Sequence, residues 1–358
     1  MNHLFLHCRP GFEKECASEI AEIAADAGVY GFPKAREGDG YVLYVTHEPD
    51  GAVRLMSKVD FHSLVFTRQW FGAVPLFDEL PVSDRIGPLL TAAIESLPVC
   101  GDLWIETVDT NLGKEMSGLS KKFIHPFRQA LKKAGRLSER SSWRLHLVFM
   151  SGTQAWLGAA RIPNSAVWPM GIARLRLPRA APSRATLKLE EAWHHFIPAN
   201  EWDERLCGGL KAVDLGAAPG GWTWQLVQRG MFVDAVDNGP MDPVLMESGQ
   251  VRHLKSDGFV YEPRKAVYWL VCDIADKPAR VTSLIGKWVA EGYCREAIFN
   301  LKLPMKQRYA EVKKLEQRLQ EKMAERDLRI ELRFKQLYHD REEVTGHLRV
   351  LTPAGVIR

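Results

Sequence analysis

The segment VDLGAAPGGWT, residues 213–223, stands between a short apolar run and a helical pattern. Glycines in such a place permit a tight turn and a close approach of the backbone to a ligand, and the first turn of the following helix offers free N–H groups to an anion. A dinucleotide-binding loop would read G-x-G-x-x-G, but Ala218 replaces its second glycine and Pro219 stiffens the turn. The segment therefore predicts a strand, a ligand-binding loop and a helix, and it makes an NAD-dependent oxidoreductase the weakest interpretation.

The D-x-G-x-x-P-G-G form of this loop suits S-adenosylmethionine, because the amino-acid carboxylate of that cofactor can accept hydrogen bonds from the free N–H groups. Asp237 ends the next predicted strand, about 20 residues after the loop, where a carboxylate holds ribose hydroxyls. Asp257 ends the third predicted strand and could accept from the adenine amino group. Either acid alone is commonly a turn or cap residue. The loop and both acids, in register at successive strand ends, predict an S-adenosylmethionine site.

Residues 183–358 alternate between short apolar runs and helical patterns. The apolar runs have the composition of buried strands and are KAVDL, FVDAVD, VRHLKSD, YWLVCDI and EAIFNLKL, with helical patterns over 278–291 and 305–326. This alternation predicts an α/β fold with a mostly parallel, doubly wound sheet of the Rossmann-like type. ELRFKQLYHD and EVTGHLRVLTP follow without a helix between them. They predict an antiparallel pair of strands at the edge of that sheet.

Residues 1–162 show strand and helix patterns in quick succession. The strand candidates are HLFLHC, GYVLYVTH, FHSLVFTRQW, DLWIETV, WRLHLVFM and AWLGAAR, and helical patterns cover 11–28, 86–97 and 119–134. The succession predicts small α+β units. An extended basic linker is expected over 163–182, because prolines and arginines are enriched there. These residues are Pro163, Pro169, Pro178, Pro182, Arg174, Arg176 and Arg179.

The composition excludes several classes of protein. With 358 residues, 46% of them hydrophobic and 26% charged, the chain has enough apolar material for more than one folded domain, so a disordered or fibrous protein is excluded. No run approaches the roughly 18 apolar residues that a membrane span needs. The six cysteines form no C-x-x-C pair, and adjacent His194 and His195 have no third ligand at a suitable spacing, so we expect no disulfide framework and no metal. A cytoplasmic protein is expected.

The charge is distributed unevenly along the chain. The net charge is +4 overall, but it is −6 over residues 1–100 (8 Lys/Arg, 14 Asp/Glu), +8 over 101–182 (13 against 5) and +2 over 183–358 (27 against 25). A basic segment beside an acidic one favours a polyphosphate partner such as nucleic acid. A solvated charged face is the commoner explanation of any single charge run.

Residues 183–345 resemble the FtsJ-type RNA 2′-O-methyltransferases through DLGAAPGGWT and the upstream SRATLKLEEA. The resemblance implies methyl transfer from S-adenosylmethionine to a ribose hydroxyl by a Lys-Asp-Lys-Glu tetrad. The catalytic residues that it implies are Lys188, Asp273, Lys302 and Glu343. The glutamate is ambiguous, because the family shows Arg-Glu-Val where this chain has REEV at 341–344; alignment on the valine selects Glu343 over Glu342. The implied cofactor-binding residues are Ser183, Gly216, Ala218, Pro219, Gly220, Gly221, Trp222, Asp237, Asp257 and Asp273.

The N-terminal HLFLHCRPGFE and the late HDREEVT extend the resemblance to the RlmM group, which methylates a cytidine of 23S ribosomal RNA. This implies a ferredoxin-like unit over 1–55, a THUMP-like RNA-binding domain over 56–162, the linker over 163–182 and a Rossmann-like class I methyltransferase domain over 183–358. We expect a monomer. RNA contacts are expected through the linker arginines and through Lys121, Lys122, Lys132 and Lys133.

The chemistry independently favours these residue types. A ribose hydroxyl must lose its proton as the methyl group moves, so a base must lie within hydrogen-bond reach. A lysine acts as a base only where burial or a like charge favours its neutral form, and Lys188 beside Lys302 would supply the like charge. A methyltransferase of another substrate class would need no lysine base. A ribosome-assembly factor with a degenerate catalytic domain would need neither lysine nor an intact glycine loop. Ordinary surface lysines would not be expected in the Lys-Asp-Lys-Glu order of the tetrad.

Overall fold

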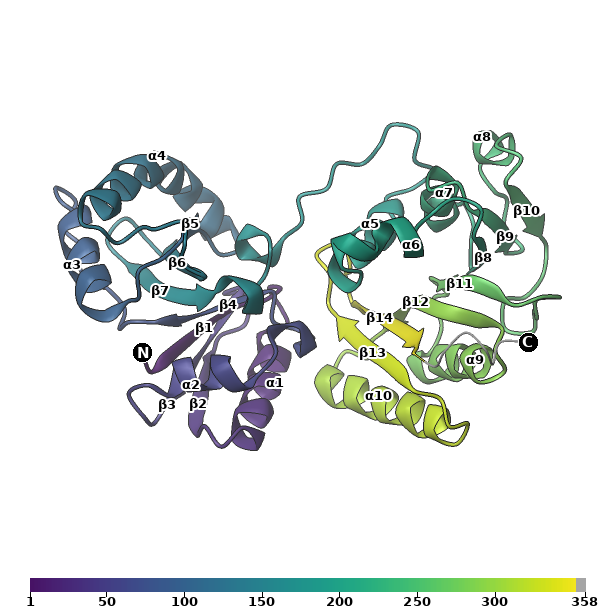
Figure 1. The fold of residues 1–358 in the computed structure, drawn as a ribbon, viewed down its shortest axis with the longest axis horizontal. Helices are drawn as coiled ribbons and strands as arrows, with labels where there is room; N and C mark the ends of the chain where they lie inside the picture. The colour runs from purple at the N-terminus through teal and green to yellow at the C-terminus, as the bar shows by residue number, and fades with distance from the viewer. Residues whose placement is uncertain (352–358) are drawn as a thin grey trace. The chain divides into compact units, whose positions relative to one another are not determined.

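The structure is a computed structural model that describes residues 1–351. The chain divides into two compact units between Ile172 and Ala173, and each unit has its own seven-stranded sheet (Figure 1). No helix within residues 1–351 is long and apolar enough to cross a membrane.

The sheet of the first unit has the strand order β2-β3-β1-β4-β7-β6-β5. Its strands are β1 (His3–His7), β2 (Gly31–Ala35), β3 (Tyr41–Thr46), β4 (Gln69–Ala73), β5 (Asp102–Glu106), β6 (Trp143–Phe149) and β7 (Ala155–Arg161). β5 and β6 run parallel, and every other neighbouring pair is antiparallel. Because β4 pairs with both β1 and β7, the segments that the sequence divides at residue 55 share one continuous sheet.

Four helices cover one face of this sheet. They are α1 (Glu13–Asp26), α2 (Gly51–Lys58), α3 (Ile86–Ser96) and α4 (Asn111–Lys133). Gly72, the cross-strand partner of Leu4 and Ala159, faces Met56 of α2, and Ala159 belongs to the apolar cluster beneath α3 and α4. α1 packs on β2 and β3 beside it. Because successive strand residues point to opposite faces, Phe5 points to the face without helices.

The predicted strand FHSLVFTRQW is wrong over its first eight residues, since β4 begins only at Gln69. Asp60 caps a 3-10 turn over Phe61–Ser63. The Glu19 carboxylate then accepts from the backbone N–H groups of Val65 and Phe66 at 2.5 and 3.0 Å. Two backbone donors of this segment are thus taken by a side chain instead of a neighbouring strand, and pairing with β1 starts at Arg68, whose N–H donates to the His7 carbonyl at 2.7 Å.

Residues 163–172, which belong to the predicted linker, pack on the first unit. Asn164 accepts from the Phe61 N–H at 2.8 Å and donates to the carbonyls of Met56 and Val59 at 2.8 and 2.9 Å. Buried Glu106 accepts from the Met170 N–H. The stretch without helix or strand therefore starts at Ala173 and ends where α5 (Thr186–Phe196) begins.

The second unit is the expected doubly wound sheet, with the strand order β10-β9-β8-β11-β12-β14-β13. The strands are β8 (Lys211–Leu215), β9 (Phe232–Val236), β10 (Val251–Leu254), β11 (Val267–Cys272), β12 (Cys294–Lys302), β13 (Ile330–Lys335) and β14 (Glu343–Val350). The first five in this order run parallel, and β14 is antiparallel to β12 and β13. Strand order reverses between β8 and β11, the kind of place where α/β sheets bind ligands.

Helices cover both faces of this second sheet. They are α5, α6 (Trp202–Arg205), α7 (Gly221–Gln228), α8 (Pro243–Met246), α9 (Pro278–Ala290) and α10 (Arg308–Ala324). α5 packs with α7 on one face, and α9 packs with α10 on the other (Figure 1). The expected antiparallel pair of strands closes one end of the sheet as β13 and β14. The pattern over 343–353 yields a strand to Val350, and residues 352 and 353 lie outside the described residues.

Candidate active site

The predicted site residues gather at one edge of the second sheet. Gly216 follows β8, Asp237 follows β9, Asp273 follows β11, and Lys302 ends β12. β14 begins at the same edge because it runs antiparallel to β12, which places Glu343 opposite Lys302 in the register. Pairing within this sheet thus assembles groups that are up to 127 residues apart along the chain (216 to 343).

The glycine loop is shaped by close contacts that leave no room for side chains. Gly216 and Gly220 have φ angles of 78° and 118°, which residues with a Cβ rarely adopt. A Cβ on Gly220 would lie 2.5 Å from Leu245, and one on Gly221 would lie 2.4 Å from the hydroxyl of Ser183. The loop therefore needs glycine at these positions, and the predicted cofactor residue Ser183 lies directly over the start of α7.

Asp214 lies buried beneath the loop, and sequence reasoning did not select it. Thr223 donates its hydroxyl proton to Oδ2 of Asp214 at 2.6 Å. Burial raises the pKa of Asp214 to about 7, against the lowering effect of the Thr223 hydrogen bond. Its other oxygen, Oδ1, is buried and has no hydrogen-bond partner among residues 1–351. This oxygen can accept a hydrogen bond from a ligand. Asp214 is the acid of the D-x-G motif, so the motif could have revealed it in the sequence.

Asp237 lies beside the same loop. Its carboxylate accepts from the backbone N–H of Ala218 at 3.1 Å and from that of Gly239 at 2.7 Å. The peptide bond between Ala218 and Pro219 is cis. A carboxylate offers about four acceptor positions, so Asp237 retains capacity for a pair of hydroxyl groups.

Two predicted cofactor residues lie differently from the expectation. β10 ends at Leu254, so Asp257 stands three residues beyond the strand; it is exposed and accepts from the Phe259 N–H at 2.8 Å in a turn. The Trp222 side chain is 2% exposed and packs in the core with Trp193. Burial stabilises the large apolar ring, so only the backbone of Trp222 is available to a ligand at the start of α7.

Lys188 is held between two predicted tetrad acids. Its Nζ lies 3.6 Å from Oδ1 of Asp273 and 3.8 Å from Oε1 of Glu343, and all three side chains are mostly buried. Burial raises the pKa of Asp273, which the charge of Lys188 and a hydrogen bond from Asn300 counteract. Glu342 points elsewhere and pairs with Arg308 at 2.6 Å. The geometry therefore brings Glu343, rather than Glu342, to the lysine.

A buried hydrogen-bond chain behind Asp273 was missed by sequence reasoning. Asn300 donates to Oδ1 of Asp273 at 2.8 Å, and Thr345 donates to Oδ1 of Asn300 at 2.8 Å. The Thr345 hydroxyl also lies 3.0 and 3.2 Å from the two oxygens of Asp340. Asp340 is fully buried, and burial raises its pKa well above the usual range. Asn300 and Thr345 stand two residues from Lys302 and Glu343 on the same strands, a spacing that could have revealed them.

Glu191 secures the helix that carries Lys188. It follows Lys188 by three residues on α5, which places the two on neighbouring turns of the same side. Its carboxylate accepts from the backbone N–H groups of Tyr338 and His339 at 2.8 and 3.0 Å. The imidazole of His339 lies 2.6 Å from the same carboxylate. These contacts join α5 to the segment before β14.

Lys302 differs from Lys188 in its surroundings. It is exposed at the end of β12, and no carboxylate among residues 1–351 lies within 4 Å of its Nζ. The structure thus brings Lys188, Asp273 and Glu343 together and leaves the second lysine facing solvent. Within residues 1–351, no group of three His, Cys, Asp or Glu side chains is placed to hold a metal ion.

The fold and the site define a Rossmann-like methyltransferase that uses S-adenosylmethionine. The residues present fit that cofactor. The loop has glycines where a Cβ would clash with neighbouring atoms, and Asp237 offers acceptors for a pair of hydroxyl groups. Oδ1 of Asp214 has no hydrogen-bond partner among residues 1–351 and can accept from a ligand. Three family models match the chain: the RlmM ferredoxin-like domain (residues 1–71), the N-terminal domain of ribosomal RNA large subunit methyltransferase M (84–161) and the FtsJ-like methyltransferase (181–307). The ferredoxin-like and FtsJ-like expectations are confirmed, and the THUMP-like label stays a prediction.

Similar proteins extend over the whole chain. Ribosomal RNA large subunit methyltransferase M of Cellvibrio japonicus is 61% identical, over 98% of this chain and 100% of its own length. The proteins of the same name from Pseudomonas syringae pv. syringae and Pseudomonas aeruginosa are 57% and 58% identical, and each alignment covers at least 98% of both chains. The chain belongs to the ribosomal RNA large subunit methyltransferase M family.

Replacement of Thr345 by valine tests the buried hydrogen-bond chain. The valine leaves the Asn300 carbonyl oxygen without its donor in a buried place, so we expect the free energy of unfolding to fall by about 1–3 kcal/mol. Thr345→Ser retains the hydroxyl and serves as the matched control. Chemical denaturation of the full chain measures both, and equal stability of the valine variant and the wild type would contradict the arrangement.

Proposed function

We propose that this chain transfers a methyl group from S-adenosylmethionine to the ribose 2′-hydroxyl of a cytidine in 23S ribosomal RNA, in the cytoplasm. The observation that carries the proposal is Lys188, held within 4 Å of both Asp273 and Glu343 at the edge that also holds the glycine loop. Methylation of nitrogen or carboxylate groups needs no lysine base. The relatives named above are ribosomal RNA methyltransferases, and their likeness extends from end to end.

In this proposal the two lysines have different tasks. Two carboxylates orient the Lys188 ammonium group, which then positions the ribose by hydrogen bonding. Lys302 is exposed where RNA would approach, and it takes the proton from the 2′-hydroxyl. Its burial beneath RNA would favour the neutral amine that a base requires. S-adenosylmethionine, when bound, supplies the methyl group as an electrophile, and much of the rate comes from holding the hydroxyl in line with it.

In this proposal the cofactor residues other than Trp222 keep the roles that the sequence predicts. Asp237 would hold the ribose hydroxyls of S-adenosylmethionine, and the N–H groups at the start of α7 would hold its carboxylate. Ser183 and the loop residues Gly216, Ala218, Pro219, Gly220 and Gly221 surround this position. Asp257 would reach the adenine from its turn.

RNA binding would extend to the first unit and the linker. Lys121, Lys122, Lys132 and Lys133 are all exposed on α4, which ends with the last two in its C-terminal turn. The linker arginines Arg174, Arg176 and Arg179 are exposed as well. A cluster of basic side chains of this kind supports contacts with phosphates.

Asp237→Ala should weaken the binding of S-adenosylmethionine by about 1–3 kcal/mol, because a hydrogen bond to a charged group is lost. Isothermal titration calorimetry measures the affinity. Asp234→Ala, on β9 three residues before Asp237 and paired with Arg252, is the control and should bind normally. Unchanged affinity in a folded Asp237→Ala variant would remove this residue from the site.

Lys302→Ala should abolish methylation and leave cofactor and RNA binding nearly intact, since removal of a general base costs about 10²–10⁴ in rate. Lys302→Arg should not restore it, because guanidinium stays protonated. Lys188→Ala should be less damaging, and Lys306→Ala is the control. The variants are compared by their methylation rates in single-turnover reactions with saturating RNA. Wild-type turnover by Lys302→Arg would exclude lysine as the base.

Replacement of Lys121, Lys122, Lys132 and Lys133 by glutamine should flatten the salt dependence of RNA affinity, because fewer counterions are released on binding. The matched control replaces Lys287, Lys313, Lys314 and Lys322 on α9 and α10. Fluorescence anisotropy at several salt concentrations gives the slopes. If both variants show the wild-type slope, the phosphates are bound elsewhere.

A further inference from the structure

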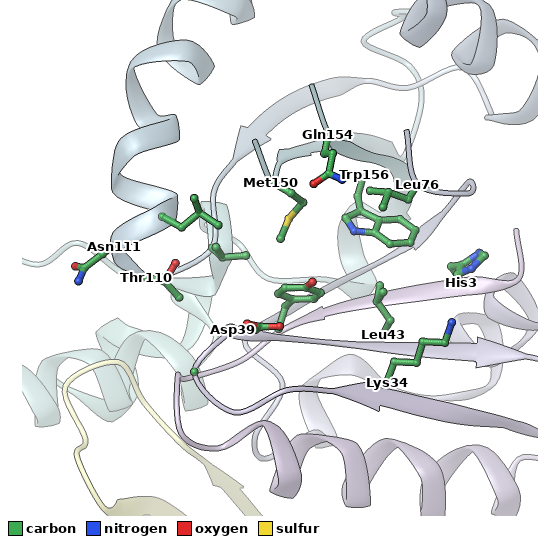
Figure 2. Close-up of a pocket in the computed structure, with 14 residues that line it drawn as sticks. His3, Lys34, Asp39, Leu43, Leu76, Thr110, Asn111, Met150, Gln154 and Trp156 are labelled. Atoms are coloured by element: carbon green, nitrogen blue, oxygen red, sulfur yellow. The ribbon is translucent and has the colours of Figure 1, made fainter. Parts of the chain in front are cut away.

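A hollow of about 770 Å³ lies on the face of the first sheet that carries Phe5, beside the first turn of α4 (Figure 2). Its volume is within the range of small-ligand pockets, about 300–1,000 Å³. Trp156, Gln154 and Met150 border it on one side, and Asp39 and Leu43 lie across from them (Figure 2). All the residues that line it belong to the first unit, so the hollow is complete without the methyltransferase domain.

A row of stacked rings leads across the sheet to this hollow. Tyr41 stacks on Phe5, Phe5 on Phe71, and Phe71 on His146, each pair with 4.9 Å between centroids and 13° or less between planes. Phe5, Phe71 and His146 are fully buried, whereas Tyr41 is partly exposed and lines the hollow. A flat ring bound in the hollow can therefore continue the row at Tyr41.

The polar groups of the hollow suit a heterocyclic base rather than a phosphate. The Gln154 amide, the Asp39 carboxylate and the Tyr41 hydroxyl make no side-chain hydrogen bond to any residue of 1–351. Together they offer donors and acceptors, and a carboxylate can accept from the amino group of a base. Asp39 would repel a phosphate, and Lys34 is the single Lys or Arg side chain in the lining.

The rim of the hollow carries apolar side chains that are partly exposed to solvent. Leu76 and Leu112 line the hollow and are 36% and 46% exposed. Unpaired bases are commonly held between aromatic and apolar side chains while polar groups bind their edges. The hollow has both kinds of group around one volume.

We propose that this hollow binds the base of an unpaired nucleotide in the RNA substrate. The inference rests on the proposed function for the presence of RNA, and it adds a contact separate from the methylation site and from the basic side chains of α4. It predicts that the first unit prefers single-stranded to fully paired RNA. Stacking supplies affinity that depends little on salt, in contrast to contacts with phosphates.

The test uses the full chain with Leu76→Glu and Leu112→Glu combined. The control combines Val82→Glu and Ile94→Glu, which are exposed apolar residues of the same unit outside the lining and give the same change in charge. The probe is a labelled single-stranded hexacytidylate, with a paired duplex of equal length for comparison. We expect the hollow variant to bind the single strand about tenfold more weakly, and the control to bind within about twofold of the wild type.

A second pair of variants, Gln154→Leu and Asp39→Asn, keeps the shape of the hollow and alters its polar groups. These variants should change the order of affinity among hexamers of A, C and U. Equal binding by the hollow variant and its control, or an equal loss for duplex RNA, would overturn the proposal. Methylation of ribosomal RNA is measured in parallel and separates the two proposals. If the wild type does not methylate the RNA but the hollow variant still binds the single strand more weakly than the wild type, only the proposed methylation is refuted.

Discussion

The parallel pairing of β8 with β9 on one side and with β11 on the other decides where the glycine loop, Asp237 and Asp273 lie. It brings the ends of β8 and β11 into contact: the Asp273 N–H donates to the Leu215 carbonyl at 3.2 Å, and a Cβ on Gly216 would lie 2.8 Å from Ile274. The glycine loop and the acid that contacts Lys188 are therefore neighbours because of backbone hydrogen bonds, before any side chain is considered.

The side chains at this edge are arranged at a cost to stability. Burial raises the pKa of Asp214, Asp273 and Asp340, so each is less easily ionised than a carboxylate in water. Hydrogen bonds from Thr223, Asn300 and the Leu337 N–H offset part of that cost. Acids with raised pKa values gathered at one edge of a sheet are typical of functional sites. The buried chain through Thr345 keeps Asp273 in one orientation, which a solvated carboxylate would not maintain.

The two faces of the first sheet differ: one packs against the helices, and the other carries the hollow for which base binding is proposed. Its helices and most of its apolar cluster lie on the face that carries Leu4, and the other face holds the stacked rings and the hollow. Residues 162–172 bind to this unit through Asn164 and Met170, so the basic connection to the second unit is short. The proposed RNA contacts thus lie in three places: on the basic side chains of α4, in the linker, and in the hollow, to which α4 contributes Asn111 and Leu112 of its first turn.

The sequence by itself determined the doubly wound sheet and the glycine loop, because the sheet depends on local apolar periodicity and the loop on a motif within a few residues. The tetrad positions, which the family resemblance implies, stay a prediction. The strand predicted over 61–68 was wrong, because Glu19 accepts from backbone N–H groups of that segment. The sequence also did not show that the Trp222 ring is buried in the core. Only the tertiary structure showed that Glu343 lies beside Lys188, and only it revealed Asn300, Thr345 and the hollow. Those features depend on the register of β14 against β12 and on the strand order of the first sheet, and contacts between residues so distant in the chain leave no local pattern.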